Sequence, residues 1–244
     1  MGGLSGATVC AILPVFRDDR IVDAVKALLK QKVRFDKIII QDPLGEYSHL
    51  EGLCDSIFVN HETDEGLFDG IDKCIDKYKY DFYFLQGADD LLVDNDFLSR
   101  FKSLASEPDI YFERIRIVGE SRVRLWPPGF FVKAGVVLPP HFGSVYKRDV
   151  LLSSRMRDFA VGGNVGADSA WFYTLDTDKL KMKYTNDQSF VMAAGGISNN
   201  SLLSPLKNLL SMEKKIRRHG SGVPLAVAKY CISSFLKLFF IRRL

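Results

Sequence analysis

The first half of the chain alternates continuous apolar runs with stretches in which apolar residues recur every three or four positions. Four such runs predict strands that are buried on both faces, at residues 8–15, 37–41, 56–59 and 82–85. Residues 21–29 and 66–78 have the spacing of amphipathic helices, and a third helix is predicted to follow a cap at Asp94 or Asn95. The alternation predicts an α/β fold with a mostly parallel sheet flanked by helices.

The second half has a less regular pattern. Residues 121–140, which mix Arg, Trp, Pro and Gly, predict an irregular loop, whereas 168–175 have a helical pattern and 188–194 that of a strand. From residue 204 onward the chain is basic and apolar and is predicted to be helical. We therefore expect one domain at 1–203 and a helical tail at 204–244.

Composition narrows the class of protein. The 244 residues are 47% hydrophobic, enough for a substantial core, and a formal net charge of +3 gives no support to nucleic-acid binding. The four cysteines form no CxxC pair, so neither a zinc site nor a disulfide framework is expected, and reduced thiols in a cytosol fit best. The N-terminus has no basic region followed by an apolar stretch, so no secretory signal is expected.

Carboxylates follow three of the predicted strands. Asp18 and Asp19 come after the first strand, Asp42 after the second, and Asp89 and Asp90 after the fourth. In parallel sheets, ligands bind beyond the carboxyl ends of the strands. Two adjacent carboxylates repel each other, and a hard dication such as Mg²⁺ or Mn²⁺ relieves that repulsion. The alternative is a solvated Asp-Asp turn that caps the next helix.

Several motifs, in a fixed order, resemble those of one enzyme family. The segment ETDEGLFDGIDKCIDKYKYDFYFLQGADDLL resembles the acidic segment of the inverting family 2 glycosyltransferases, which have a GT-A fold. Further similar motifs are CAILPVFRDD and IIIQD before it, and LPPHFGSVYKRDVL, GNVGADSAWFYTL and MAAGGISNNSL after it. The resemblance covers residues 8–202 and implies that 1–120 bind a nucleotide and 121–203 an acceptor.

The resemblance also implies roles for individual residues. It places Pro14, Val15 and Phe16 beneath the nucleotide, Asp42 at the base or ribose, Glu62, Asp64 and Asp69 beside the donor, and Asp89 at the ribose or a bound water. Asp90 is expected to coordinate the Mn²⁺ or Mg²⁺ ion that bridges the diphosphate. Where the family usually has Asn, Gly, Asn and Gln, this chain has Asp72, Cys74, Gly87 and Phe142.

The second half supplies the candidate catalytic base. Asp168 matches the family's second Asp-bearing motif and lies at the start of a predicted helix, where a helix N-cap is the alternative role. His141 is expected to touch the metal, the diphosphate or the donor sugar, or else to be structural. Trp126 is a candidate for stacking on a sugar, and the backbone of Gly195 and Gly196 for binding phosphate. Loop packing and a strand-end turn are the alternatives.

The tail combines positive charge with apolar residues. Its longest apolar stretch, GVPLAVAKYCISSFLKLFFI, is interrupted by Lys229 and Lys237, which disfavours a membrane span and favours a helix lying on an anionic membrane surface. That would hold a cytoplasmic protein at the inner face of the cytoplasmic membrane, beside a lipid-linked acceptor. The alternative is a terminal helix that packs on the domain or on the second subunit of a homodimer.

The resemblance implies the transfer, with inversion, of a sugar from a nucleoside-diphosphate sugar, a UDP-sugar by default, to a glycan or lipid-linked glycan. It points to bacterial surface polysaccharides such as O-antigen or capsule. One alternative is a metal-dependent nucleotidyltransferase, although the glycine- and lysine-rich triphosphate loop typical of that class is missing. The other is an inactive carbohydrate- or membrane-binding module, against which the intact Asp89, Asp90 and Asp168 argue.

Overall fold

The structure is a computed structural model. It describes residues 4–118, 122–126, 139–160, 163, 166–177, 179–193, 210, 212–214, 216–217, 228, 231–232 and 241–243. For residues 5, 122–124, 193 and 241–243 it describes the backbone only.

A seven-stranded sheet of order β10-β6-β9-β4-β1-β2-β3 forms the centre of the molecule. Its strands are β1 (Val9–Pro14), β2 (Lys37–Gln41), β3 (Ile57–Asn60), β4 (Phe82–Leu85), β6 (Ile110–Phe112), β9 (Ser144–Lys147) and β10 (Met182–Tyr184). The four neighbours β4, β1, β2 and β3 run parallel, and β9 lies antiparallel between β4 and β6. Both faces of β1 and β4 are buried, which explains their unbroken apolar sequences.

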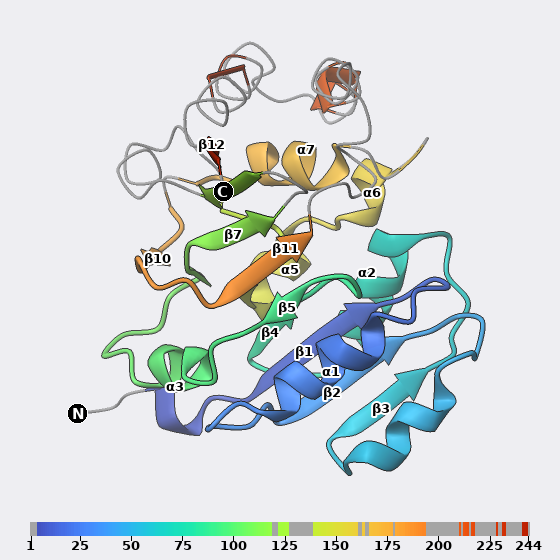
Figure 1. Ribbon diagram of the computed structural model, residues 1–244. Helices are drawn as coiled ribbons and strands as arrows, with labels where there is room; N and C mark the ends of the chain where they lie inside the picture. The colour runs from blue at the N-terminus through green and yellow to red at the C-terminus, as the bar shows by residue number, and fades with distance from the viewer. Residues whose placement is uncertain are drawn as a thin grey trace.

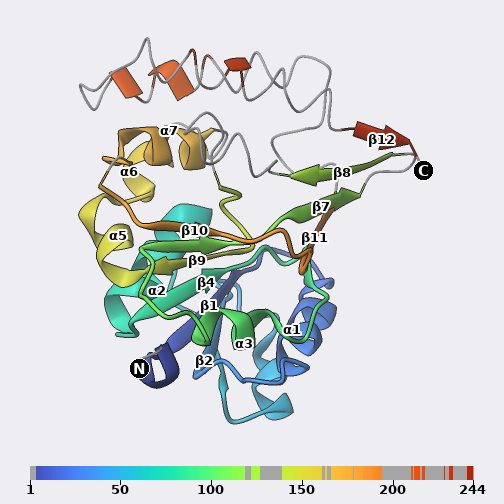
Figure 2. The ribbon, with the colours of Figure 1, turned by 90° about the vertical axis from the view of Figure 1, so that its left-hand side faces the viewer.

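Helices cover both faces of this sheet. They are α1 (Ile21–Leu29), α2 (Leu67–Lys77), α3 (Phe97–Lys102), α5 (Arg148–Ser153), α6 (Arg157–Ala160) and α7 (Ala167–Thr174), with short 3-10 helices η1 (Leu4–Gly6) and η2 (Ser48–Leu53). In Figure 2, α2 and α5 lie on one side of the central strands and α1 on the other. The buried residues Ile21, Val25 and Leu28 share one face of α1, which is the face that the helical spacing predicts.

A second, five-stranded sheet has the order β12-β8-β7-β11-β5. Its strands are β5 (Leu91–Leu92), β7 (Ile115–Val118), β8 (Arg122–Trp126), β11 (Phe190–Ala193) and β12 (Ile241–Arg243). The chain passes from the central sheet into this one at three places, from β4 to β5, from β6 to β7 and from β10 to β11. Figure 1 shows β7 and β11 above the central sheet, with α6 and α7 beside them, and Figure 2 shows β8 next to β7. The arrangement confirms the predicted GT-A fold: mixed α/β, with a mostly parallel central sheet flanked by helices.

Three sequence-based predictions of local structure need correction. Residues 122–126, predicted as irregular loop, form β8, and residues 241–243, predicted as helix, form β12. These two strands pair with each other, antiparallel, and β8 pairs with β7 as well, so it is β12 that depends on a partner distant in sequence. Asp96, rather than Asp94 or Asn95, is the N-cap of α3, and the side chain of Asp94 accepts a hydrogen bond from the Asp96 amide.

The structure also describes the cysteines and part of the predicted tail. All four cysteines are free, and Cys10 is buried in β1. Residues 210, 212–214 and 216–217 of the predicted tail are helical. Within the described part of the chain, no helix has both the length and the apolar character that a membrane span requires.

Candidate active site

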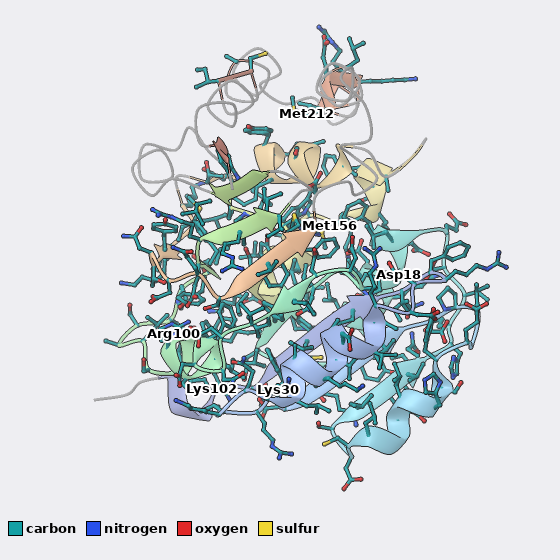
Figure 3. All side chains as sticks on the ribbon, viewed as in Figure 1. Asp18, Lys30, Arg100, Lys102, Met156 and Met212 are labelled. Carbon is teal, nitrogen blue, oxygen red and sulfur yellow. The ribbon has the colours of Figure 1, made fainter. Side chains whose placement is uncertain are left out.

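The carboxyl ends of β4, β1, β2 and β3 meet at one edge of the central sheet. Backbone hydrogen bonds continue the pairing into the loops: the Val15 amide donates to Gln41 O (3.0 Å), the Gln86 amide to Ile12 O (3.1 Å), and the Asp42 amide to Asn60 O (3.0 Å). The loops that carry the predicted carboxylates therefore lie side by side. Asp18 lies at this edge, just beyond the end of β1 (Figure 3).

The Asp89–Asp90 pair lies in the loop that links the two sheets. Asp90 is only 3% exposed, and its carbonyl accepts a hydrogen bond from Gln86 Nε2 (2.9 Å). A Cβ atom at Gly87 would lie 2.8 Å from Asp90 Oδ2 and 3.0 Å from Asp89 Oδ1. Glycine is therefore what allows both carboxylates to fold back over the loop. Strand β5 follows the pair directly, so the alternative that Asp89 and Asp90 cap a helix is wrong.

The side chain of Arg20 lies beside the Asp89–Asp90 pair in the folded chain. The guanidinium of Arg20 forms two hydrogen bonds with Asp18 (2.8 and 2.6 Å), and its Nη2 lies 3.8 Å from Asp89 Oδ2. The hydrogen bonds from Arg20 lower the pKa of Asp18. The pKa of Arg20 is raised, first by Asp18 and further by the charges of Asp89 and Asp90. The sequence analysis missed Arg20, although it is in the same β1 loop as the carboxylates.

Asp42 organises the loop after β2. Its Oδ1 accepts hydrogen bonds from the amides of Leu44 and Gly45, and its Oδ2 accepts one from the Tyr47 amide (2.7 Å). The Tyr47 hydroxyl then donates to Asp19 (3.2 Å), which joins this loop to the one after β1. The proposed contact of Asp42 with a base or ribose stays a prediction.

Gln41, a buried residue that the sequence analysis did not select, connects β2 to the acidic segment before α2. Its Nε2 donates to the carboxylate of Asp64 (2.8 Å) and to the carbonyl of Glu62 (2.7 Å). A Cβ at Gly70 would come within 2.7 Å of Asp64 Oδ2, so Gly70 gives this carboxylate its space. In the sequence, Gln41 is only a polar residue at the end of an apolar run, which does not reveal these contacts.

The other donor-side carboxylates are paired with cations. Asp69 lies 2.8 Å from Lys73 and 3.5 Å from Arg157, and exposed Glu62 lies 3.7 Å from Lys77. Burial acts to raise the pKa of Asp69, but the hydrogen bonds that it accepts outweigh burial, and the pKa is lowered. Asp69 is therefore charged at neutral pH.

The three residues predicted to lie beneath the nucleotide, Pro14, Val15 and Phe16, differ in burial. Pro14 and Val15 are buried, whereas Phe16 is 68% exposed. The guanidinium of Arg17 lies 5.5 Å from the centre of the Phe16 ring. Arg17 has a φ of 49°, a conformation that costs a non-glycine residue about 1 kcal/mol or more. The loop thus presents an uncovered aromatic ring at the edge that carries the carboxylates.

His141 lies at the same edge, because β9 begins where the antiparallel β4 ends and Ser144 pairs with Leu85. Its ring packs against Phe68 (5.5 Å between centroids) and Trp171 (6.1 Å). Its Nε2 atom is buried and has no hydrogen-bond partner among the described residues. Burial lowers the pKa of His141 to about 4, against the opposing charge of Asp168, so the ring is neutral at pH 7.

Asp168 reaches this region from α7. The N-cap of α7 is Gly166, in a left-handed conformation, and Asp168 is in the first helical turn. The alternative role of Asp168 as a helix N-cap is therefore wrong. Its charge acts to raise the pKa of both His141 and Tyr146, whose ring centres lie 6.1 Å apart.

The structure thus places the predicted donor-side residues on the loops after β1, β2, β3 and β4 and at the start of α2, His141 before β9, and Asp168 in α7. Trp126 is buried, which favours packing over sugar stacking, while Gly195 and Gly196 lie outside the described residues. Among the described residues, no group of three or more His, Cys, Asp and Glu side chains could hold a metal ion. A dication at Asp89 and Asp90 would need further ligands from water and substrate, which is how Mg²⁺ is commonly bound.

Solved structures share this fold. The chain matches S. aureus TarS 1–349 in complex with UDP-GlcNAc with a TM-score of 0.63 at 12% identity, over 94% of this chain and 73% of that one. It matches the mannosyltransferase PcManGT from Pyrobaculum calidifontis, in complex with GDP-Man and Mn²⁺, with a TM-score of 0.61 at 16% identity, over 96% and 75%. These neighbours are GT-A-like glycosyltransferases. No protein-family model and no curated protein matches the sequence.

Proposed function

We propose that the protein is an inverting glycosyltransferase that moves a sugar from a nucleoside-diphosphate sugar to an acceptor hydroxyl. The observation that carries the proposal is the grouping of the Asp89–Asp90 loop, His141 and Asp168 at the carboxyl edge of a GT-A sheet. Two structures of this fold were solved with UDP-GlcNAc and with GDP-Man and Mn²⁺.

The residues at the Asp pair fit a hard dication, Mn²⁺ or Mg²⁺. Carboxylate oxygens are the ligands that such ions prefer, and Gly87 leaves the space that both carboxylates need. Asp90 would hold the ion directly, with Asp89 at the ribose or a bound water. A dication bound here stabilises the negative charge of the departing nucleoside diphosphate.

Asp168 is the catalytic base in this proposal. Its carboxylate takes the proton of the acceptor hydroxyl while that oxygen forms a bond to the anomeric carbon. The bond between that carbon and the diphosphate oxygen breaks, and its electron pair leaves with the nucleoside diphosphate. Attack from the opposite face inverts the anomeric centre. His141, neutral and next to Asp168, would contact the donor sugar without adding charge.

The remaining donor-side residues would bind the nucleotide. Phe16, with Pro14 and Val15, offers an exposed ring for the base, and Asp42, Glu62, Asp64 and Asp69 line the neighbouring loops. We propose a UDP-sugar as donor and a glycan or lipid-linked glycan of a bacterial surface polysaccharide as acceptor. The basic tail would hold the protein at an anionic membrane beside that acceptor.

Two variants test the site. In Asp168→Asn, UDP release from a panel of UDP-sugars with Mn²⁺ should fall by about 10²–10⁴-fold, while UDP affinity is unchanged. In Asp90→Ala, UDP binding measured by calorimetry should no longer depend on Mn²⁺. The control is Asp55→Ala, an exposed carboxylate before β3, which should behave as wild type. Near-normal turnover of Asp168→Asn, or an undiminished Mn²⁺ effect in Asp90→Ala, would contradict the assignment.

A further inference from the structure

Arg20 holds a positive charge at the position where the proposed function requires a dication to bind. Its Nη2 atom lies 2.6 Å from Asp18 Oδ2 and 3.8 Å from Asp89 Oδ2. The other cation of this loop, Arg17, pairs instead with Glu46 at 3.8 Å. Arg20 therefore neutralises part of the negative charge of the Asp pair whenever no donor is bound.

This charge affects a free ion and a nucleotide-bound ion in opposite ways. A free dication that approaches Asp89 and Asp90 is repelled by the guanidinium beside them. A dication that arrives with a nucleoside-diphosphate sugar belongs to a complex without net positive charge, because the diphosphate diester carries two negative charges. With UDP, whose terminal phosphate carries a further charge, the complex is negative. The guanidinium is attracted to the phosphate oxygens of either complex, and arginine is well suited to them.

The side chain of Arg20 is free to change partner. It is 60% exposed, and it lies at the N-terminal boundary of α1, so turning from Asp89 to a diphosphate requires no repacking of the core. The bidentate contact with Asp18 keeps the guanidinium close to the edge in either case.

We propose that Arg20 makes metal binding at Asp89 and Asp90 depend on the nucleotide, by opposing the free dication and by donating to the diphosphate of the bound donor. The inference rests on the proposed function. It makes Arg20 a substrate-binding residue that couples the two ligands, so that the site fills as a donor–metal complex rather than with metal first.

The test is a titration of the full chain with Mn²⁺, in which free Mn²⁺ is measured by electron paramagnetic resonance with and without UDP. Removing one unit charge beside a dication should tighten Mn²⁺ binding without UDP roughly tenfold in Arg20→Met. The enhancement of Mn²⁺ affinity by UDP should shrink by at least the same factor. Arg20→Lys, which keeps the charge, should stay close to wild type. Arg17→Met removes an equal charge from the same loop and should leave Mn²⁺ affinity without UDP unchanged.

The outcomes separate this inference from the proposed function. One outcome is that wild type, Arg20→Met and Arg17→Met bind Mn²⁺ equally well without UDP, while UDP still enhances Mn²⁺ binding in wild type. That outcome would overturn the role of Arg20 and leave the proposed function in place. If wild type binds Mn²⁺ no better with UDP or GDP than without, the proposed donor–metal site itself is wrong. Circular dichroism of Arg20→Met checks that the exposed substitution leaves the fold intact.

Discussion

Asp72 is a carboxylate enclosed between α2 and the start of α6. It is 0% exposed; its Oδ2 accepts a hydrogen bond from the Arg157 amide (3.0 Å), and its Oδ1 has no hydrogen-bond partner among the described residues. Burial raises the pKa of Asp72 from 3.8 to about 6, although the Arg157 amide and the charges of Arg155 and Arg157 oppose the shift. The family that this chain resembles usually has Asn at this position, and the amide side chain of Asn does not titrate.

The Asp72 carboxyl should make the stability of the protein fall as pH rises. Because its folded pKa of about 6 exceeds the ordinary 3.8, the folded chain keeps a proton in this window that the unfolded chain has lost, and stability declines between these two values. We expect Asp72→Asn to raise the free energy of unfolding at pH 8 by roughly 1–3 kcal/mol, and the gain to vanish near pH 4. Urea denaturation at a series of pH values measures both the gain at pH 8 and its disappearance near pH 4.

The matched control for Asp72 is Asp76→Asn on the same helix. Asp76 is exposed and paired with Arg155, so its substitution should change stability by less than about 1 kcal/mol. Stability–pH curves of Asp72→Asn and wild type that run parallel from pH 4 to 8 would rule out this role of Asp72.

Between elements, one ionic cluster joins the two sheets. Arg100 of α3 donates two hydrogen bonds to buried Glu113 (2.9 and 3.0 Å), which lies between β6 and β7, and it pairs with Asp94 (2.9 Å). The hydroxyls of Tyr111 and of Ser189, just before β11, also donate to Glu113. The cluster therefore fixes the point at which the chain passes from the central sheet into the second one.

Arg100→Met should leave the Glu113 charge buried without its cation and destabilise the protein by about 3 kcal/mol. Adding Glu113→Gln should recover part of the loss, because it removes that charge. Lys32→Met is the control: it breaks an exposed ion pair with Asp96 (2.9 Å), which should be worth at most about 1 kcal/mol. Guanidinium denaturation measures the free energy of unfolding of Arg100→Met, of the double variant and of Lys32→Met. A loss in Arg100→Met no larger than in Lys32→Met would show that the cluster is not what joins the sheets.

The sequence predicts some elements of this fold better than others, for physical reasons. β1, β2 and β4 were found within about two residues because strands buried on both faces have continuous apolar runs, such as KIIIQ. β8 and β12 were missed because their sequences are rich in Arg, and because β12 pairs only with β8, which is distant in sequence. β10, with exposed Lys183, has too little buried surface to leave a pattern in three residues.

The same reasons apply to the site. The Asp89–Asp90 pair and Asp168 could be selected because they match motifs that are contiguous in sequence. Arg20 and Gln41 could not, because what gives them importance is the approach of a neighbouring loop, to Asp89 in one case and to Asp64 in the other. Proximity between loops depends on strand order, which periodicity does not specify.

For the molecule as a whole, the proposed membrane contact depends on the charges of the tail. Each basic residue near an anionic surface contributes about 1 kcal/mol, so reversing three, as in Lys214→Glu/Lys215→Glu/Arg218→Glu, should weaken co-sedimentation with phosphatidylglycerol vesicles at least tenfold. Mn²⁺-dependent UDP binding should be unchanged. Neutral phosphatidylcholine vesicles are the control, and equal sedimentation of variant and wild type with the anionic vesicles would refute the contact.

Deleting every residue after Pro205 is a second way to test the tail, but it removes β12 as well. Strand β8 would then keep β7 but lose β12, and it would become the edge strand of the sheet in place of β12. A newly exposed edge promotes aggregation. The charge-reversal variant keeps β12 and is therefore the cleaner of the two.

The pairing of β12 with β8 also constrains how far the basic segment can reach. The segment follows β11 and ends in β12, and both strands are in the same sheet. Met212 and Ile216, which lie within it, are buried. A segment held at several points explores much less space than an arm attached at one end. A lipid surface bound by a segment held in this way would meet the protein at a restricted tilt, and the tilt would decide which acceptor hydroxyls come within range of Asp168.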